Sequence, residues 1–370
     1  IAHNGNLTNA HSVRKELVRG GCIFQSTSDT EIIVHLMATN PGTVVERLIV
    51  ALRQIEGAYS LAIMAEDCMI GVRDPNGVRP LVLGQLDDSY ILASESVAFD
   101  IIGADFVRDV EPGELIVIDA DGVHSHRPFP PAQSRFCIFE HIYFSKPDSV
   151  VDGTSVYEAR KRIGVELARE IPIEADIVVP VPDSGVPSAI GFAAEAGLPY
   201  ELGIIRNHYV GRTFIEPSDE IRHFGVKLKH NANRAVIEGK RVILVDDSIV
   251  RGTTSKKIVE MVRSAGAKEV HLRISSPPTT HSCFYGVDTP ERDQLLAANN
   301  DVESMRKLIG ADSLAFISID GLYRAMGLPG RDPEAPHYCD ACFSGDYPIR
   351  LTDQIGGNGS RQLSLLAETG

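Results

Sequence analysis

The residues most suggestive of chemistry lie in one run in the second half of the chain. It reads Val242-Ile243-Leu244-Val245-Asp246-Asp247-Ser248-Ile249-Val250-Arg251-Gly252-Thr253-Thr254. Four apolar residues predict a short buried strand, and the spacing of apolar residues after Thr254 predicts a helix. Backbone N–H groups at a helix start bind anions, and Arg251 and Thr253 add a positive charge and a hydroxyl. The run therefore predicts a phosphate-binding loop between a strand and a helix.

The adjacent acids Asp246 and Asp247 fit a different task. Two carboxylates would repel a phosphate unless they bound Mg²⁺ or ribose hydroxyls. The sequence has no G-x-x-x-x-G-K-[ST] motif and no G-x-G-x-x-G after a strand, which disfavours a P-loop NTPase and a Rossmann dinucleotide enzyme. The simpler alternative is a strand that ends in solvated acids followed by an N-cap.

Two further segments carry groups suited to an anion. The loop Pro182-Asp183-Ser184-Gly185-Val186-Pro187 follows a predicted strand and precedes a predicted helix, although on its own an ordinary turn with an N-cap explains it. The polar interval from Arg206 to Lys229 is long for a connection inside a sheet, as lids often are. Its cations are Arg206, Arg212, Arg222, Lys227 and Lys229.

The elements before about Phe129 predict an α+β part. Helical spacing covers Asn9 to Arg19 and Thr30 to Ala38. Turn residues at Asp74-Pro75-Asn76-Gly77 and Asp119-Ala120-Asp121-Gly122 favour antiparallel hairpins. The expected strands are Tyr59 to Ala65, Met69 to Val72, Leu81 to Leu83, Tyr90 to Ala93 and Leu115 to Ile118.

After about Thr154 strands alternate with helices, which predicts an α/β part with a mostly parallel sheet and helices on both faces. Ligands of such sheets bind beyond the carboxyl ends of the strands. The expected strands are Asp176 to Val181, Leu202 to Ile205, Val242 to Val245 and Val270 to Ser275, and the expected helices are Val186 to Glu195 and Thr254 to about Ala265. We expect domains at 1–130 and 131–345 and a C-terminal tail at 346–370, which should be flexible from Gly356 onward.

The run from Val242 to Thr254, together with the Pro182 loop, resembles the loops that bind phosphoribosyl pyrophosphate (PRPP) in type I phosphoribosyltransferases. The resemblance implies that the acids bind the ribose hydroxyls, that the loop amides bind the 5′-phosphate, and that Ser184, Asp246 and Asp247 hold Mg²⁺. The residues it assigns to PRPP are Asp183, Ser184, Gly185, Arg212, Asp246, Asp247, Ser248, Ile249, Val250, Arg251, Gly252, Thr253 and Thr254.

The first residues carry a second set of polar groups. On their own, His3-Asn4-Gly5-Asn6-Leu7 and Thr27-Ser28-Asp29-Thr30-Glu31 predict an Asn-Gly turn and a capping box. Together with Arg73 to Leu81 and Ala93 to Ser96, they resemble the glutaminase domain of N-terminal-nucleophile amidotransferases, an α/β sandwich. The resemblance implies that Asn4 and Gly5 form an oxyanion hole and that Asp29 holds the amino group of glutamine.

A glutaminase domain joined to a PRPP domain resembles the glutamine PRPP amidotransferases, which are pentosyltransferases of purine synthesis. The resemblance implies that PRPP and glutamine, or ammonia, react to 5-phosphoribosylamine in a homotetramer that purine nucleotides inhibit. The family needs a first mature Cys, whereas residue 1 is Ile. We therefore expect an N-terminally truncated chain with an incomplete glutaminase part, limited to ammonia. A base-salvage phosphoribosyltransferase and a PRPP-binding regulator without turnover are the alternatives.

Four of the six cysteines suggest a further group. By spacing, Cys339-Asp340-Ala341-Cys342, with the distant Cys137 and Cys283, is consistent with a metal site or with buried thiols. The segments around these cysteines resemble those that hold a [4Fe–4S] cluster in one branch of the family. Four thiolates would also suit Zn²⁺.

Composition excludes several classes of function. A net charge of −14 disfavours binding to nucleic acids or to membrane surfaces, and no stretch is apolar for long enough to span a bilayer. Six cysteines without a signal-peptide pattern predict a reducing compartment, and we expect the cytoplasm.

Overall fold

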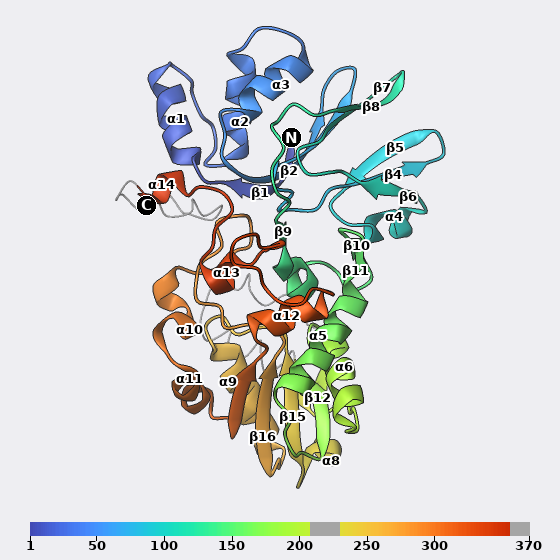
Figure 1. Cartoon of the computed structure of the whole chain (residues 1–370), viewed down its shortest axis with the longest axis vertical. Helices are drawn as coiled ribbons and strands as arrows, with labels where there is room; N and C mark the ends of the chain where they lie inside the picture. The colour runs from blue at the N-terminus through green and yellow to red at the C-terminus, as the bar shows by residue number, and fades with distance from the viewer. Residues whose placement is uncertain (208–229, 356–370) are drawn as a thin grey trace.

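The chain forms two α/β halves, one above the other in Figure 1, with the C-terminal segment returning to the boundary between them. The computed structural model describes residues 1–207 and 230–355. The interval 208–229, which includes Arg212 and most of the expected lid, and the expected tail from 356 onward lie outside the described residues.

The first half is built on a five-stranded antiparallel sheet of strand order β1-β2-β3-β7-β8 and a three-stranded sheet of order β5-β4-β6. Apolar faces of α2 and α3 pack on the five-stranded sheet in one core. The elements are β1 (Ala2–Leu7), α1 (Ala10–Arg19), α2 (Thr30–Ala38), α3 (Val44–Leu52), β2 (Gly57–Met64), β3 (Met69–Arg73), β4 (Val82–Leu86), β5 (Ser89–Ala93), α4 (Val97–Ile102), β6 (Asp105–Asp109), β7 (Leu115–Asp119) and β8 (Gly122–His126).

Three local predictions for this half are wrong. Asn4-Gly5 is not a turn, because β1 pairs with β2 residue by residue through both positions. Residues 27–31 form no capping box, since the Glu31 carboxylate accepts hydrogen bonds from the N–H groups of Gln25 and Ser26 instead. The turn at Asp74 to Gly77 is present, but β3 and β4 on either side of it belong to different sheets. The hairpin at Asp119 to Gly122 is confirmed.

The second half contains a four-stranded parallel sheet of order β12-β15-β16-β17, which confirms the predicted fold class. Alternate residues of β15 face opposite cores. Val242 and Leu244 pack with α9 and α11, while Ile243 and Val245 pack with α5, α6 and α12. The elements are α5 (Val156–Glu170), β12 (Ile177–Pro180), α6 (Val186–Ala196), β15 (Arg241–Asp246), α9 (Thr253–Ser264), β16 (Glu269–Ile274), α11 (Val302–Ile309), β17 (Ser313–Phe316) and α12 (Ile319–Ala325).

Smaller elements surround this sheet. The expected strand from Leu202 to Ile205 exists as β13, but it pairs antiparallel with β14 in a separate ribbon. The elements are β10 (Val150–Val151), β11 (Thr154–Ser155), β13 (Ile204–Arg206), β14 (His230–Ala232), α8 (Arg234–Ile237), the 3₁₀-helix η3 (Arg292–Gln294) and α10 (Leu296–Asn299).

The two halves are joined by segments that are far apart in sequence. Strands β9 (Phe136–Cys137) and β18 (Tyr338–Cys339) form a parallel pair at the boundary, followed by the short π-helix η1 (Glu140–Phe144) and by α13 (Ala341–Ser344) respectively. Helix α14 (Thr352–Ile355) lies beside α1, where the Asp353 carboxylate accepts hydrogen bonds from His11 and Ser12. None of the described helices is long and apolar enough to cross a membrane.

Candidate active sites

The paired acids lie at the carboxyl end of β15, and both are buried. The Asp247 carboxylate accepts hydrogen bonds from the Ser184 hydroxyl at 2.6 Å and from the Ser248 hydroxyl at 2.5 Å. The Asp246 carboxylate accepts the backbone N–H of Asp247 at 2.9 Å. The two loops that the sequence places 63 residues apart therefore meet through direct side-chain contacts.

Gly185 allows this close approach of the two loops. Strands β12 and β15 are parallel neighbours, so their following loops leave the same edge of the sheet. A Cβ atom at position 185 would overlap the carbonyl oxygen of Val245. Only glycine fits at this position without moving the Ser184 loop away from the acids.

The start of α9 completes this site. Gly252 precedes the helix in a left-handed conformation, and no side chain caps the first N–H groups of the helix. Thr253 and Thr254 are exposed there, whereas the Ile249 side chain is buried in the core, so that only its backbone can face a ligand. The exposed Arg251 donates to Gln294. The free N–H groups and the helix dipole form a site that favours an anion.

Among the described residues no salt bridge involves Asp246 or Asp247, although the charge of the buried Arg160 interacts with that of Asp247. Burial, and next the charge of Asp247, raise the pKa of Asp246 well above its usual value. A cation or a set of hydroxyl donors would stabilise both carboxylates. In the neighbouring loop, Asp183 forms an ion pair with Arg206 at the end of β13.

The second set of predicted residues lies on the boundary side of the first half. Asn4 and Gly5 are adjacent in β1, and Asp29 directly precedes α2. One Asp29 oxygen accepts the N–H of Leu7 at 2.9 Å, and the other lies 3.5 Å from the His3 ring. Burial alone would raise the pKa of Asp29, but the hydrogen bond and charge of His3 and the N–H of Leu7 outweigh it and lower that pKa.

Two residues with no role assigned from sequence hold the Asn4 side chain. Its amide oxygen accepts from Arg79 Nε at 3.1 Å, and its amide nitrogen donates to the Ser94 hydroxyl at 3.1 Å. Both residues lie in segments already noted in the sequence, but their position beside Asn4 depends on how the two sheets of the first half pack. No local pattern indicates it.

The four cysteines line one apolar cavity of about 30 Å³ at the boundary between the halves. Cys137 belongs to β9, Cys339 to β18 and Cys342 to α13, and Cys283 lies in the loop after β16. Burial raises the pKa of all four thiols, that of Cys137 to about 12. As positioned, the described side chains include no group of three or more His, Cys, Asp or Glu that could hold a metal ion.

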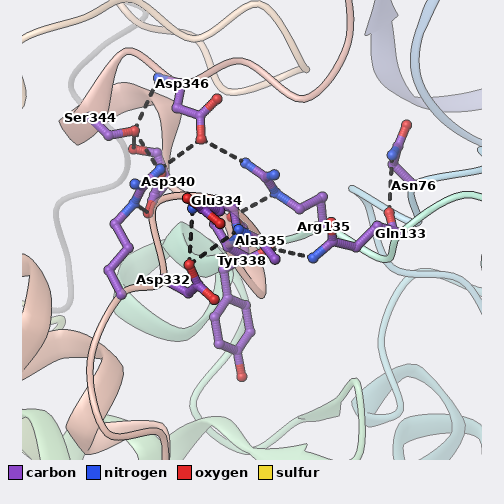
Figure 2. A network of polar contacts seen from close by, with 12 residues as sticks. Asn76, Gln133, Arg135, Asp332, Glu334, Ala335, Tyr338, Asp340, Ser344 and Asp346 are labelled. Atoms are coloured by element: carbon purple, nitrogen blue, oxygen red, sulfur yellow. Dashed lines mark hydrogen bonds and ion pairs between the residues drawn. The ribbon is translucent and has the colours of Figure 1, made fainter.

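A polar network fixes the Cys339–Cys342 loop against β9 (Figure 2). The buried Asp340 carboxylate accepts from Arg331 at 2.6 Å and from the Ser344 hydroxyl at 2.7 Å. Asp346 accepts from the same Arg331 at 2.8 Å and from Arg135 at 3.2 Å. Because Arg135 is two residues before Cys137, the network holds the cysteine-bearing segments together.

The loop that carries Cys283 also touches the strand that carries Asn4. A Cβ atom on Gly286 would lie 2.9 Å from the Cα atom of Gly5, so the two backbones are in close contact. Asn6 donates to the carbonyl oxygen of Phe284 at 3.0 Å. The predicted glutamine site and the cysteine cavity are therefore neighbours.

Comparisons with known proteins cover both halves. Residues 1–100 match the model of a glutamine amidotransferase domain, and residues 148–275 match that of a phosphoribosyl transferase domain. An amidophosphoribosyltransferase of Rhizobium etli is 56% identical over 377 residues, covering 100% of this chain and 76% of the relative. The Bacillus subtilis enzyme is 49% identical, covering 95% and 74%, and a chloroplastic enzyme of Arabidopsis thaliana is 51% identical, covering 95% and 62%.

A solved structure extends this similarity to the fold. The glutamine PRPP amidotransferase of B. subtilis, complexed with ADP and GMP, superposes with a TM-score of 0.89 at 49% sequence identity, covering 95% of this chain and 77% of that one. Identity at this level over nearly the whole chain, with both domain models matched in order, shows that the chain belongs to the amidophosphoribosyltransferase family of pentosyltransferases.

Proposed function

We propose that the second half transfers nitrogen to C1 of PRPP, releasing pyrophosphate and forming 5-phosphoribosylamine, the first step of de novo purine synthesis. The observation that carries this proposal is the contact of Ser184 with Asp247, which joins two anion-binding loops into one site. The N–H groups from Ser248 to Thr254 bind the 5′-phosphate, and the loop from Asp183 to Gly185 binds the pyrophosphate.

The chemistry follows from this placement. The lone pair of ammonia forms the C1–N bond while the C1–O bond breaks and its electron pair leaves with pyrophosphate. The nitrogen then releases a proton to solvent. Asp246, Asp247 and Ser184 present oxygen atoms of the type that Mg²⁺ prefers, and the ion would compensate the charge of the leaving group. Arg212 is assigned to the same pyrophosphate, and it lies outside the described residues.

We also propose that the first half binds glutamine. The Asn4 amide and the Gly5 N–H stabilise the tetrahedral oxyanion, and Asp29 binds the amino group of the substrate. The two cysteines of this half lie elsewhere, since Cys22 lines a surface cavity with Val13 and Leu36 and Cys68 packs near the start of β3. The site of the second half is proposed to accept free ammonia as a nitrogen donor as well.

The test measures pyrophosphate release from PRPP and Mg²⁺ with ammonia, glutamine or a purine base as the acceptor. Release with ammonia supports the proposed transfer, and release with glutamine as well supports the role proposed for the first half. Release only with a purine base would replace the proposal by salvage chemistry, and tight PRPP binding without release would make the chain a regulator.

For the cysteine cavity we propose a [4Fe–4S] cluster bound by Cys137, Cys283, Cys339 and Cys342. Support comes from the donor set, four thiols around one apolar cavity, and such a cluster would tie the C-terminal segment to both halves. Iron and sulfide are measured in protein purified without oxygen. Cys339→Ser should lose the iron while Cys22→Ser keeps it, and a colourless protein that contains zinc would overturn the assignment.

The proposal extends to organisation and regulation. We propose domains at 1–130 and 131–345 with a tail at 346–370, assembled as a homotetramer that purine nucleotides inhibit. Support for inhibition comes from the ADP and GMP bound by the B. subtilis relative. All six thiols are free, which supports a reducing compartment such as the cytoplasm. Light-scattering mass and nucleotide inhibition curves test the assembly and the regulation.

A further inference from the structure

The Asn4 amide is held from both ends by side chains of the first half. Arg79 Nε lies 3.1 Å from one end and the Ser94 hydroxyl 3.1 Å from the other. A guanidinium group has only donors, so the end of the amide that faces Arg79 must be the carbonyl oxygen. The NH₂ group then faces away from Arg79. One of its hydrogens bonds Ser94, and the other remains available for an anion.

Arg79 is anchored across the boundary between the halves. Its side chain is buried and its Nη1 lies 3.0 Å from the carboxylate of Glu140 in η1. The guanidinium also lies over the Phe144 ring, 4.4 Å from its centre. The contact with Glu140 is an ion pair without hydrogen-bond geometry, and Glu140 is the strongest charged partner of Arg79, ahead of the nearby Cys137 and Cys283 thiols. Glu140 in turn accepts from the Ser145 hydroxyl at 2.5 Å.

Ser94, the second hydrogen-bond partner of the Asn4 amide, is flanked by residues that contact the segment following η1. Glu95, next to Ser94, accepts from the N–H of Lys146 at 2.8 Å and from the Ser149 hydroxyl at 2.7 Å. The following Ser96 hydroxyl accepts the N–H of Val150 at 2.9 Å. Both contacts of the Asn4 amide therefore lead to residues 140–150 of the second half.

We propose that Arg79 is a positioning residue for glutamine hydrolysis, which orients the Asn4 amide so that its NH₂ group faces the oxyanion, and that Glu140 holds Arg79 in this position. The inference rests on the glutaminase role proposed for the first half. It adds that the oxyanion hole is completed by an arginine whose anchor belongs to the other half of the chain.

A double-mutant cycle on glutamine hydrolysis tests the proposal. Arg79→Lys keeps the charge but loses the bond to Asn4, and kcat should fall by about 10–100-fold with little change in KM. In an Asn4→Ala background the same substitution should have no further effect, because Arg79 acts only through Asn4. Arg108→Lys, which alters a different arginine of the first half, is the matched control.

Two results would overturn the positioning role. One is an unchanged kcat in Arg79→Lys, and the other is an equal loss in the presence and absence of Asn4, which indicates a general structural effect. Ammonia-dependent release of pyrophosphate should stay constant in all these variants. Glu140→Gln retains a hydrogen-bonding side chain without the charge and should lower kcat by a smaller factor in the same direction.

The orientation of the amide can also be measured without turnover. In protein labelled with ¹⁵N-asparagine, the Asn4 side-chain signals are identified by their loss in Asn4→Ala. Arg79→Lys should shift them and speed their hydrogen exchange, whereas Arg108→Lys should not. Unchanged signals in folded Arg79→Lys would refute the inference. If the unsubstituted enzyme hydrolyses no glutamine, the proposed glutaminase role fails, and this measurement still decides how Asn4 is positioned.

Discussion

Asp29 in the first half and Asp246 in the second belong to the two proposed substrate sites. Their surroundings shift the pKa values of the two carboxyl groups in opposite directions. The charge of Asp29 is stabilised by His3 and by the N–H of Leu7, which outweigh burial and lower its pKa. The pKa of Asp246 is raised because burial and the neighbouring Asp247 both disfavour its charge. The first site is electrostatically complete within the protein, whereas the second needs a cation or hydroxyl donors from its substrates.

The two sites also differ in how the chain assembles them. Residues 246–254 supply most of the proposed PRPP site from one continuous stretch, and Ser184 is added from the loop after the adjacent strand. The proposed glutamine site draws Asn4, Asp29, Arg79 and Ser94 from four segments. A continuous motif can be found from sequence alone, while a composite site depends on packing between distant segments.

The largest expected effect comes from substitutions that disrupt only the proposed PRPP site. Asp246→Asn or Asp247→Asn should reduce pyrophosphate release on the order of 10³-fold, because the oxygens assigned to Mg²⁺ and ribose lose their charge. The fold should persist, since each substitution removes like-charge repulsion in a buried site. Activity assays with thermal unfolding test this, and unchanged turnover would refute the assigned role.

The next prediction concerns the packing between the two PRPP loops. Gly185→Ala should cost about 2–3 kcal/mol of unfolding free energy and lower transfer, because the new Cβ meets the Val245 carbonyl oxygen. Gly197→Ala is the matched control. It has open space around it and a left-handed backbone, so it should cost only about 1 kcal/mol and leave transfer unchanged. Urea unfolding compares the variants, and equal costs would show that the close approach is unimportant.

A third prediction concerns the response of the first half to acid. Burial would raise the pKa of Glu114, but Arg108 and Ser125 hold it at about 2 in the folded chain. Because this folded-state pKa is lowered, the stabilisation is complete above about pH 4.5 and is lost as the pH falls towards 2.

Glu114→Gln should therefore destabilise the first half by about 2 kcal/mol at pH 7, a figure reduced for the water that reaches Arg108. The difference from the unsubstituted chain should shrink by pH 3. Hydrogen exchange of β7 amides measures it locally, and a difference that does not depend on pH would contradict the assigned charge.

The smallest effect is the response to metal. Mg²⁺ at ten times its dissociation constant should stabilise the second half by about 1.4 kcal/mol, because the ion compensates the charge of the two buried acids. Calorimetry of the chain and of Asp246→Asn separates this from general salt effects. An equal shift in both proteins would place the ion elsewhere.

The parallel sheet could be predicted from the sequence because its strands are continuous apolar runs separated by helices. Val242 to Val245 and the helix after Gly252 are placed within a residue or two of their observed bounds. Strand β1 was not predicted. The preference of Asn4-Gly5 for a turn is a local property of the sequence, whereas the pairing of β1 with β2 depends on a distant segment. The helix α3 was also missed, although Thr43 and Glu46 form the capping box that marks its start.

For the sites, the residues that touch within one loop were predictable and those that touch across the fold were not. The contact between Ser184 and Asp247 follows from adjacent parallel strands. The bond from Arg79 to Asn4 and its ion pair with Glu140 follow from no spacing or period. The cysteines could be grouped only by family resemblance, since nothing local relates Cys137 to Cys339.

The pairing of β9 with β18 has a consequence for how the protein is made. Arg135 and Tyr338, which are bonded beside this pair, are 203 residues apart. Closing a loop of that length costs about 5 kcal/mol of chain entropy, and the closure comes only when the last strand is available. During synthesis the two sheets can form as they emerge. The cysteine cavity can be completed only after residue 342 has left the ribosome, so the joint between the halves closes later than either sheet can form.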